Sequence, residues 1–318
     1  MRTPTPDIRG IAFPLRLGEW TLAAPIRRLV VRNSGLLAGP VEEASHREED
    51  LPVEADGYML VQPARNGLEK GEGAEREENG LIPWVLRRGP RYFVRLEGSF
   101  DDYLARFSGK SRSNLRRKGR RLERESGEKA HFLAYRQGGF GDFYVAAREV
   151  SKHTYQEIMF GAGLPEDPVS AEAMRHQMDS GEAVGYMLFL GDVPVAYLYC
   201  PCREGIYEYQ YVGFRPDYGH LSPGTVLLLR ALEDVFNDPK AVAFDFTEGG
   251  GEESHKAYFA TDSVIFETRV LLRQTFPNYG LIAARYSMDN ISGGAGAVLS
   301  FLGVKKTIRH LMRRLAGS

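Results

Sequence analysis

Short apolar runs separated by charged segments dominate the first hundred residues. Four of these runs are rich in β-branched and aromatic residues, which are typical of strands. They cover residues 26–32, 57–62, 81–87 and 91–96. The charged stretch 64–80 contains four glycines and little apolar content, so it predicts a mobile loop.

The hydrophobic period lengthens after residue 98. Apolar residues at i, i+3, i+4 and i+7 predict an amphipathic helix over 100–107. A second helix, 110–125, places Leu115, Gly119 and Leu122 on one face. Ser113–Asn114 is expected to cap its start, and Gly119 is expected to let it pack closely on a neighbour.

The second helix raises a functional question, because it carries eight Lys or Arg residues between 110 and 124. Such a segment suits a nucleic acid or a membrane surface. A protein that binds nucleic acid through charge usually has a basic domain, however, and this chain has a formal net charge of −1. We therefore interpret the segment as a packed amphipathic helix with a cationic outer face.

From residue 130 onwards, strands and helices alternate. Strands are predicted at 130–136, 183–191, 193–202, 206–214, 241–247 and 265–273, and helices at 138–156, 171–181, 222–238 and 252–260. Gly191-Asp192 joins two strongly β-type runs, which predicts a hairpin. The order predicts an α/β protein of the α+β kind, with helices packed on a mixed, mostly antiparallel sheet.

Length and composition limit the class of protein. A chain of 318 residues with 43% hydrophobic residues has room for about two globular domains. The N-terminus has no apolar signal core, and no run reaches the roughly 18 residues of a membrane span, so the predicted location is cytoplasmic. Cys200 and Cys202 lack the further ligands of a zinc site, and we predict no metal.

The sharpest local signal is the strand, polar loop and helix over 206–238. Ser222–Gly224 combines a favoured N-cap, a proline at the first helical position and a glycine that lets a ligand approach. The free N–H groups at a helix start bind anions. Because Arg215 and His220 add cationic donors nearby, the segment predicts an anion site.

The next strand ends in polar residues. Strand alternation places Asp245 and Thr247 on one face, away from the phenylalanines beside them. In a sheet that is splayed at its middle, this face and the neighbouring Tyr209 and Tyr211 would meet at one crevice. Lys256 follows on the next short helix.

Three segments resemble motifs of one enzyme family in the same order. Residues 91–125 contain a strand, an amphipathic helix and a K-x-R-x-N-x-R-R sequence that opens the basic helix. The helix 222–238 is similar to an acyl-donor helix, and residues 244–260 resemble a strand, a glycine turn and a Y-K-x-x-F-type signature. Over residues 91–275 the chain resembles Fem-type (FemAB-like) and BioF2-like members of the GNAT N-acyltransferase superfamily.

The resemblance implies a GNAT-like mixed sheet with helices on both faces, in a family whose members carry two GNAT-like halves. Residues 1–98 would be a partial or degenerate first half, and residues 99–290 the acyltransferase domain. Residues 291–318 would form a C-terminal basic helix. That helix is predicted to dock on the domain, with peripheral membrane contact as the alternative.

The resemblance also implies a reaction. An N-acyltransferase would move the acyl group of an acyl-CoA, such as acetyl-CoA, to an amine by direct attack on the thioester. The acceptor would be an amino sugar, an amino acid or a precursor of the cell envelope or of a polysaccharide. Such a reaction requires the two substrates to be aligned, the carbonyl polarised and a proton removed from the amine.

Residue roles follow from the same resemblance. Those implied to bind the donor are Arg215, His220, Ser222, Gly224 and Thr225. Those implied for catalysis are Asp245 or Glu248 as proton acceptor, Tyr211 as donor to the leaving thiolate and Lys256 as an anion contact. Those implied on the acceptor side are Tyr155, Gln156, Tyr209 and Thr247.

Two other functions stay open. Fem-type relatives use aminoacyl-tRNA as donor, and the basic helix 110–125 would then guide the tRNA backbone. In the second, the chain is a non-catalytic binding module in the assembly of the cell envelope or of a polysaccharide.

Overall fold

A computed structural model describes residues 7–17, 20–37, 46–64, 73–74, 79–154, 157–158, 163–248, 254–285 and 287–288. The chain divides into two compact units, one formed by Met1–Gly89 with Ile265–Ser318 and the other by Pro90–Val264. These borders differ from the predicted 98/99 and 290/291, because the last strand returns to the first unit. Most of the predicted loop 64–80 and the whole predicted helix 291–318 lie outside the described residues.

The first unit is built on a sheet. Its strands follow the order β1 (Ile8–Ala12), β4 (Ile26–Asn33), β5 (Gly57–Pro63), β14 (Asp262–Arg273) and β7 (Leu81–Arg95). The short elements are β2 (Leu15–Leu17), β3 (Trp20–Ala23), η2 (Glu48–Asp50) and β6 (Gly73–Ala74). The two strands predicted at 81–87 and 91–96 are one strand, β7. Gly89-Pro90 does not end it, since the extended backbone accepts the φ of proline.

The second unit contains the other part of the sheet. Its strands follow the order β13 (Ala243–Glu248), β11 (Ile206–Glu208), β10 (Val193–Arg203), β9 (Ala183–Leu190) and β8 (Ala130–Tyr135), with the end of β7 beside β13 and β12 (Tyr211–Phe214) beside β10. All pairs in this unit are antiparallel except that of β11 with β13. The predicted mixed, mostly antiparallel sheet is confirmed.

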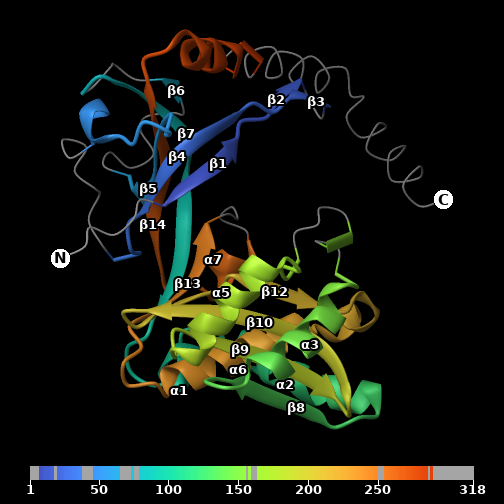
Figure 1. Cartoon of the computed structure of the whole chain (residues 1–318). Helices are drawn as coiled ribbons and strands as arrows, with labels where there is room; N and C mark the ends of the chain where they lie inside the picture. Colours follow the sequence, from blue (N-terminus) through green and yellow to red (C-terminus); the bar gives the residue numbers. More distant parts are fainter. Residues whose placement is uncertain are drawn as a thin grey trace, which may run out of the picture. The chain divides into compact units, whose positions relative to one another are not determined.

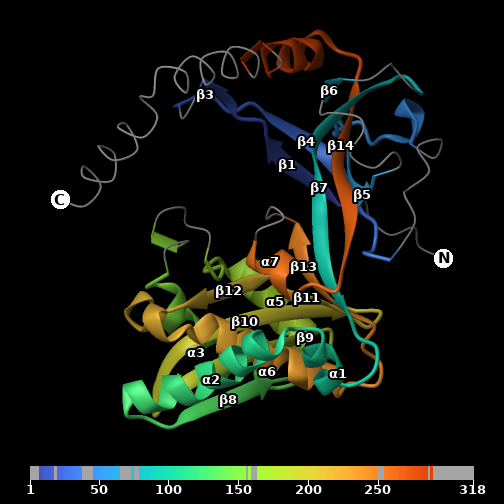
Figure 2. The same ribbon diagram turned by 180° about the vertical axis from the view of Figure 1, so that it is seen from behind.

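Helices cover both faces of this sheet (Figures 1 and 2). One face carries α3 (Phe140–Ser151) and α5 (Pro168–Asp179), and the other carries α1 (Phe100–Ala105), α2 (Gly109–Ser126) and α6 (Pro223–Phe236). The short α7 (His255–Phe259) follows β13. Each face buries its own apolar cluster, which fixes the register of the strands between them. No helix among the described residues has the length and apolar content needed to cross a membrane.

The basic helix α2 packs as predicted along its apolar seam. Leu115 and Leu122 are 5% and 0% exposed. Its caps differ from the prediction, because Ser108 accepts the Ser111 N–H and residues 113–114 already lie inside the helix. Gly119 also differs, since a Cβ added there would meet no atom within 4 Å. The glycine therefore faces open space and does not mark a close helix contact.

Candidate active site

The sheet of the second unit divides at one point. Strand β11 pairs in parallel with β13 as far as Glu208 opposite Asp245, and the Tyr209 N–H donates to the Asp245 carbonyl at 2.8 Å. Beyond that point, β12 continues along β10 with Tyr211 opposite Tyr199. β13 stays paired with β7 and has no pair with β12 among the described residues. The segment 206–214, predicted as one strand, is thus two strands, and the predicted splay lies between β12 and β13.

Helix α6 starts at this divided end. Pro223 occupies the first turn as predicted, but Ser222 is not a side-chain cap. Its φ of 58° is left-handed, whereas a capping side chain reaches the first turn from an extended backbone. A Cβ at Gly224 would lie 3.3 Å from the Phe214 ring, so the glycine lets the first turn pack on the end of β12.

The predicted cations of the loop lie around the 3-10 helix η3 (Pro216–Leu221). Arg215 pairs with Asp217 at 3.6 Å, and its guanidinium lies 6.0 Å from the centre of the Tyr218 ring. His220 is exposed in the last turn of η3. The Asp217 carboxylate is exposed, and among the described residues Arg215 Nε is buried without a hydrogen-bond partner, so Arg215 retains a donor for an anion.

The cation that reaches the first turn of α6 comes from the basic helix α2. Lys118 Nζ lies 3.4 Å from Thr225 Oγ1, and burial lowers the pKa of this lysine. Sequence reasoning missed Lys118 because seven neighbouring cations gave the same signal. Only the packing of α2 beside α6 and η3 distinguishes it from the cations that face solvent.

His255 adds a second titratable group beside Lys118. Its ring centre lies 4.7 Å from that of Phe259, and burial lowers the pKa of His255, with a further contribution from the Lys118 charge. Partial desolvation and the nearby Lys118 charge thus both disfavour the protonated imidazole, although part of the residue is exposed. The predicted anion contact, Lys256, is the next residue of α7.

We expect His255 to make the protein less stable in acid. Its folded pKa lies below the usual 6.5, so the unfolded chain binds the proton first as the pH falls. This contribution is complete above about pH 6.5 and is lost as the pH falls towards the folded pKa. Urea unfolding at pH 7.5 and 5.5 should show a smaller loss of stability for His255→Gln than for the parent. An equal loss in both proteins would contradict the prediction.

Asp245 forms the buried centre of the divided sheet. Its side chain is 0% exposed and accepts from Arg91 through both oxygens, with Nε at 3.1 and 2.8 Å and a further short contact from Nη2. The Thr247 N–H also donates to Asp245 Oδ1 at 2.8 Å. These contacts occupy both oxygens and do not suit the predicted role of Asp245 as proton acceptor. For Glu248, the alternative proton acceptor, the structure describes only the backbone.

Glu208 is the carboxylate that sequence reasoning missed. It stands opposite Asp245 at the last pair before the sheet divides, and it is half-buried. Burial raises the pKa of Glu208, and the Asp245 charge raises it further, against the opposing effects of Arg91 and Arg203. A glutamate inside an aromatic β-type run was the available signal, and it was interpreted as part of an ordinary strand.

The two predicted tyrosines lie in different surroundings. Tyr209 packs on Phe244 and Phe246, with ring centres 6.1 and 5.7 Å away, in the cluster beneath α6. Tyr211 packs near Tyr199 at 6.2 Å, in the cluster on the α3 and α5 face. The prediction that both reach one crevice is corrected, because the ladder changes partner between β11 and β12.

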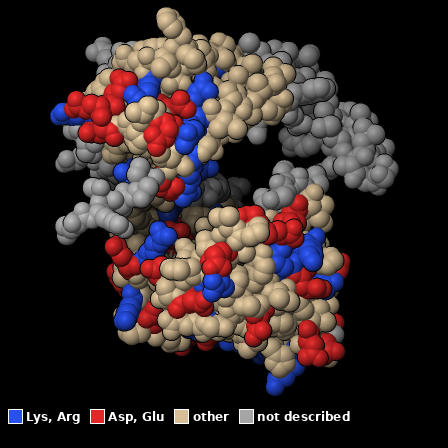
Figure 3. Space-filling view, in the orientation of Figure 1, with Lys and Arg blue, Asp and Glu red and all other residues tan. Residues whose placement is uncertain are grey.

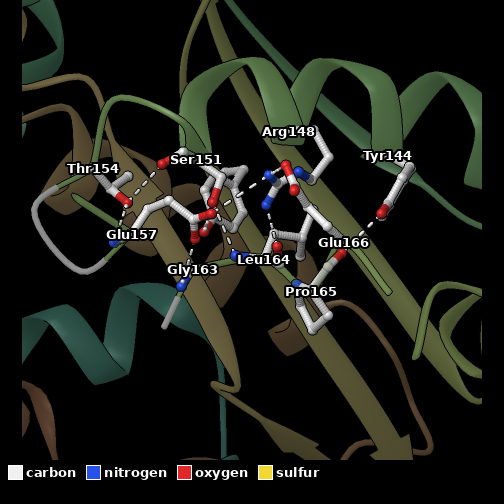
Figure 4. Close-up of polar contacts among 10 residues, drawn as sticks. Tyr144, Arg148, Ser151, Thr154, Glu157, Gly163, Leu164, Pro165 and Glu166 are labelled. Atoms are coloured by element: carbon white, nitrogen blue, oxygen red, sulfur yellow. Dashed lines mark hydrogen bonds and ion pairs between the residues drawn. The ribbon is translucent and has the colours of Figure 1, made fainter. Parts of the chain in front are cut away.

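The connection between α3 and α5 is fixed around Arg148 (Figure 4). This buried side chain donates to the Leu164 carbonyl and pairs with Glu157 at 3.5 Å and with Glu166. Both ends of the connection are thus tied to α3. The predicted acceptor contacts, residues 155–156, belong to this connection and lie outside the described residues.

Comparison with known proteins gives one family match and a group of structural likenesses. Residues 109–257 match the family model of the acetyltransferase (GNAT) domain. The structure of FemX aligns with a TM-score of 0.50 at 10% identity, over 86% of this chain and 90% of that chain. None of the curated proteins matches the sequence.

Two further solved structures align more loosely. L-PGS from Bacillus licheniformis has a TM-score of 0.44 at 16% identity, over 72% of each chain. A GCN5-related N-acetyltransferase from Kribbella flavida has a TM-score of 0.37 at 13% identity, over 69% of each chain. At such low identities a structural likeness shows a shared fold alone.

Proposed function

We propose that this chain transfers an acyl group from acyl-CoA to an amine, since residues 109–257 match the family model of the acetyltransferase (GNAT) domain. The observation that carries the proposal is the divided sheet. On one side of the division, strand β12 leads to the start of α6. On the other side, β13 pairs with β7, and the buried ion pair of Arg91 and Asp245 links these two strands. The family match favours a transferase over the non-catalytic alternative.

The donor side is proposed at the first turn of α6. Pro223 has no N–H and the Thr225 N–H donates to the Ser222 carbonyl at 3.1 Å, so this turn offers an anion the Gly224 N–H and the positive end of the helix dipole. Lys118 adds a cation at Thr225, and Lys256 is proposed as a second contact. These features together suit the phosphates of CoA. The other residues predicted to bind the acyl donor lie near this turn and keep that proposed role: Arg215, His220, Ser222 and Gly224.

The chemistry is proposed at the division itself, between the end of β11 and the start of β12. The amine nitrogen attacks the thioester carbonyl, the carbon–sulfur bond breaks and the sulfur leaves as a thiolate. Glu208 accepts the proton of the amine, for which its raised pKa is better matched to neutral pH than that of an ordinary carboxyl. Burial also raises the pKa of Tyr211, so its phenol stays protonated and donates to the thiolate.

The acceptor is proposed to be a small amine, such as an amino sugar, an amino acid or an envelope precursor. Tyr155, Gln156 and Thr247 keep their proposed acceptor contacts, that of Thr247 through its backbone, and Glu248 remains a second candidate for the proton acceptor. The contacts of Arg148 support this placement, because they hold the ends of the segment that carries two of these residues.

The donor assignment predicts a weaker complex for Lys118→Ala. Loss of one charged phosphate contact should raise the Kd for acetyl-CoA by about tenfold. The matched control is Arg120→Ala, which removes an exposed cation from the same helix and should leave the Kd unchanged. Calorimetry with acetyl-CoA measures both. Equal effects of the two substitutions, or no binding by the parent, would contradict the assignment.

Aminoacyl-tRNA is the second candidate donor, favoured by the outer face of α2. Arg117 and Arg120 are exposed there, while Figure 3 shows acidic and basic side chains interspersed over the α3 and α5 face. If α2 binds RNA, the affinity should fall steeply as the salt concentration rises. An Arg116→Ala/Arg117→Ala variant should lose this salt dependence. Native mass spectrometry of freshly purified protein separates the candidates by showing whether a CoA thioester or an RNA is bound.

A further inference from the structure

Thr247, at the end of β13, has an unusual backbone conformation. Its φ is 59°, in the left-handed region that β-branched residues rarely adopt. Four described non-glycine residues have positive φ, and two of them, Ser222 and Thr247, lie at the start of α6 and the end of β13. Both therefore border the division of the sheet.

The conformation of Thr247 is held by buried charge. Its N–H donates to Asp245 Oδ1 at 2.8 Å, and Arg91 fixes that carboxylate from β7. Asp245 is fully buried and the Arg91 side chain is 6% exposed. The strained residue thus has a rigid, desolvated partner two positions earlier in the chain.

The turn at Thr247 changes which residue stands opposite β7. Asp245 pairs with Phe93, but the next residues to pair are Glu248 and Arg91. Three steps along β13 therefore match two steps along β7, which is the signature of a β-bulge. Bulges of this kind commonly take glycine at the left-handed position. A threonine there is costly and persists only where its surroundings impose the conformation.

We infer that Thr247 is a positioning residue for acyl transfer, held in its strained turn by the buried Arg91–Asp245 pair. The bulge it creates sets the last residues of β13 beside the division where the thioester is proposed to react. The inference rests on the proposed function for its catalytic consequence, whereas the strain itself is independent of any substrate.

Thr247→Gly tests the strain. Glycine adopts positive φ without cost, so this variant should lower the unfolding equilibrium constant in urea roughly fivefold. Thr247→Val keeps the β-branch and therefore the strain, so its unfolding equilibrium constant should stay within about twofold of that of the parent. A destabilised glycine variant, or a valine variant stabilised as much as the glycine variant, would overturn the inference.

Rescue tests the positioning role. Asp245→Asn disturbs the pair with Arg91 and should lower turnover of acetyl-CoA with an active amine by roughly tenfold or more, with little change in the Kd for acetyl-CoA. Thr247→Gly in that background should restore most of the turnover, because glycine keeps the turn without the carboxylate. A folded double variant no faster than Asp245→Asn overturns the inference. Failure of the parent to bind acetyl-CoA would instead refute the proposed donor, and the unfolding data would still decide the strain.

Discussion

Glu208→Gln is expected to lower kcat by about 10²-fold or more while leaving acetyl-CoA binding unchanged. The amide keeps the size of the side chain but cannot accept the proton of the attacking amine. In the parent, kcat/KM should rise with pH along a limb whose midpoint lies above the usual carboxyl pKa of 4.5, because burial and the Asp245 charge raise the pKa of Glu208. That limb should be missing in the variant. Release of free thiol during turnover with a panel of amines measures both effects.

Glu204→Gln is the matched control for this prediction. Glu204 lies four residues earlier, in the turn between β10 and β11, and is exposed. Its substitution should leave kcat unchanged. If Glu208→Gln keeps full turnover and Glu248→Gln does not, the proton acceptor is Glu248 and the role assigned to Glu208 is wrong.

Arg91→Met should produce the largest loss of stability among single substitutions in the divided sheet. It leaves the fully buried carboxylate of Asp245 without its guanidinium partner, and removing one member of a buried pair costs about 3–5 kcal/mol. Urea denaturation followed by circular dichroism measures the free energy of unfolding. Stability should be lost with an unchanged m-value, since the surface exposed on unfolding stays the same.

Two further variants define the origin of that loss. In the double variant Arg91→Met/Asp245→Leu no buried charge is left alone, so it should be more stable than Arg91→Met. Arg121→Ala breaks an exposed pair with Glu125 and should have little effect. A double variant as unstable as the single one would show that Arg91 stabilises the fold through packing and not through Asp245.

Local sequence signals predicted much of the fold. Two strongly β-type runs around Gly191-Asp192 located the β9–β10 hairpin, and a helical period located α1, α2 and α6 within a few residues. These signals are short-range, because side-chain periodicity is set by the backbone geometry of one element. Cap positions were less accurate, since Ser108 and Ser113 have the same chemistry and only the helix start distinguishes them.

The candidate site was only partly predictable. The order of strand, loop and helix located the start of α6 and the polar end of β13, including Asp245 and Thr247. The partner of Asp245 is Arg91, which lies 154 residues away in the sequence, so no local pattern connects the two. In the sequence, Lys118 is likewise one of eight equivalent cations, and only the packing of α2 beside α6 distinguishes it.

By itself, the sequence determined the elements, the class of fold and the resemblance to acyltransferases, because each depends on local pattern and order. Only the tertiary structure decided which polar residues meet. It made Asp245 the partner of a buried arginine, brought Glu208 beside it at the division of the sheet, and imposed a left-handed turn on Thr247. The physical reason is that desolvation and charge pairing depend on distance in space, and residues distant in sequence supply the partners.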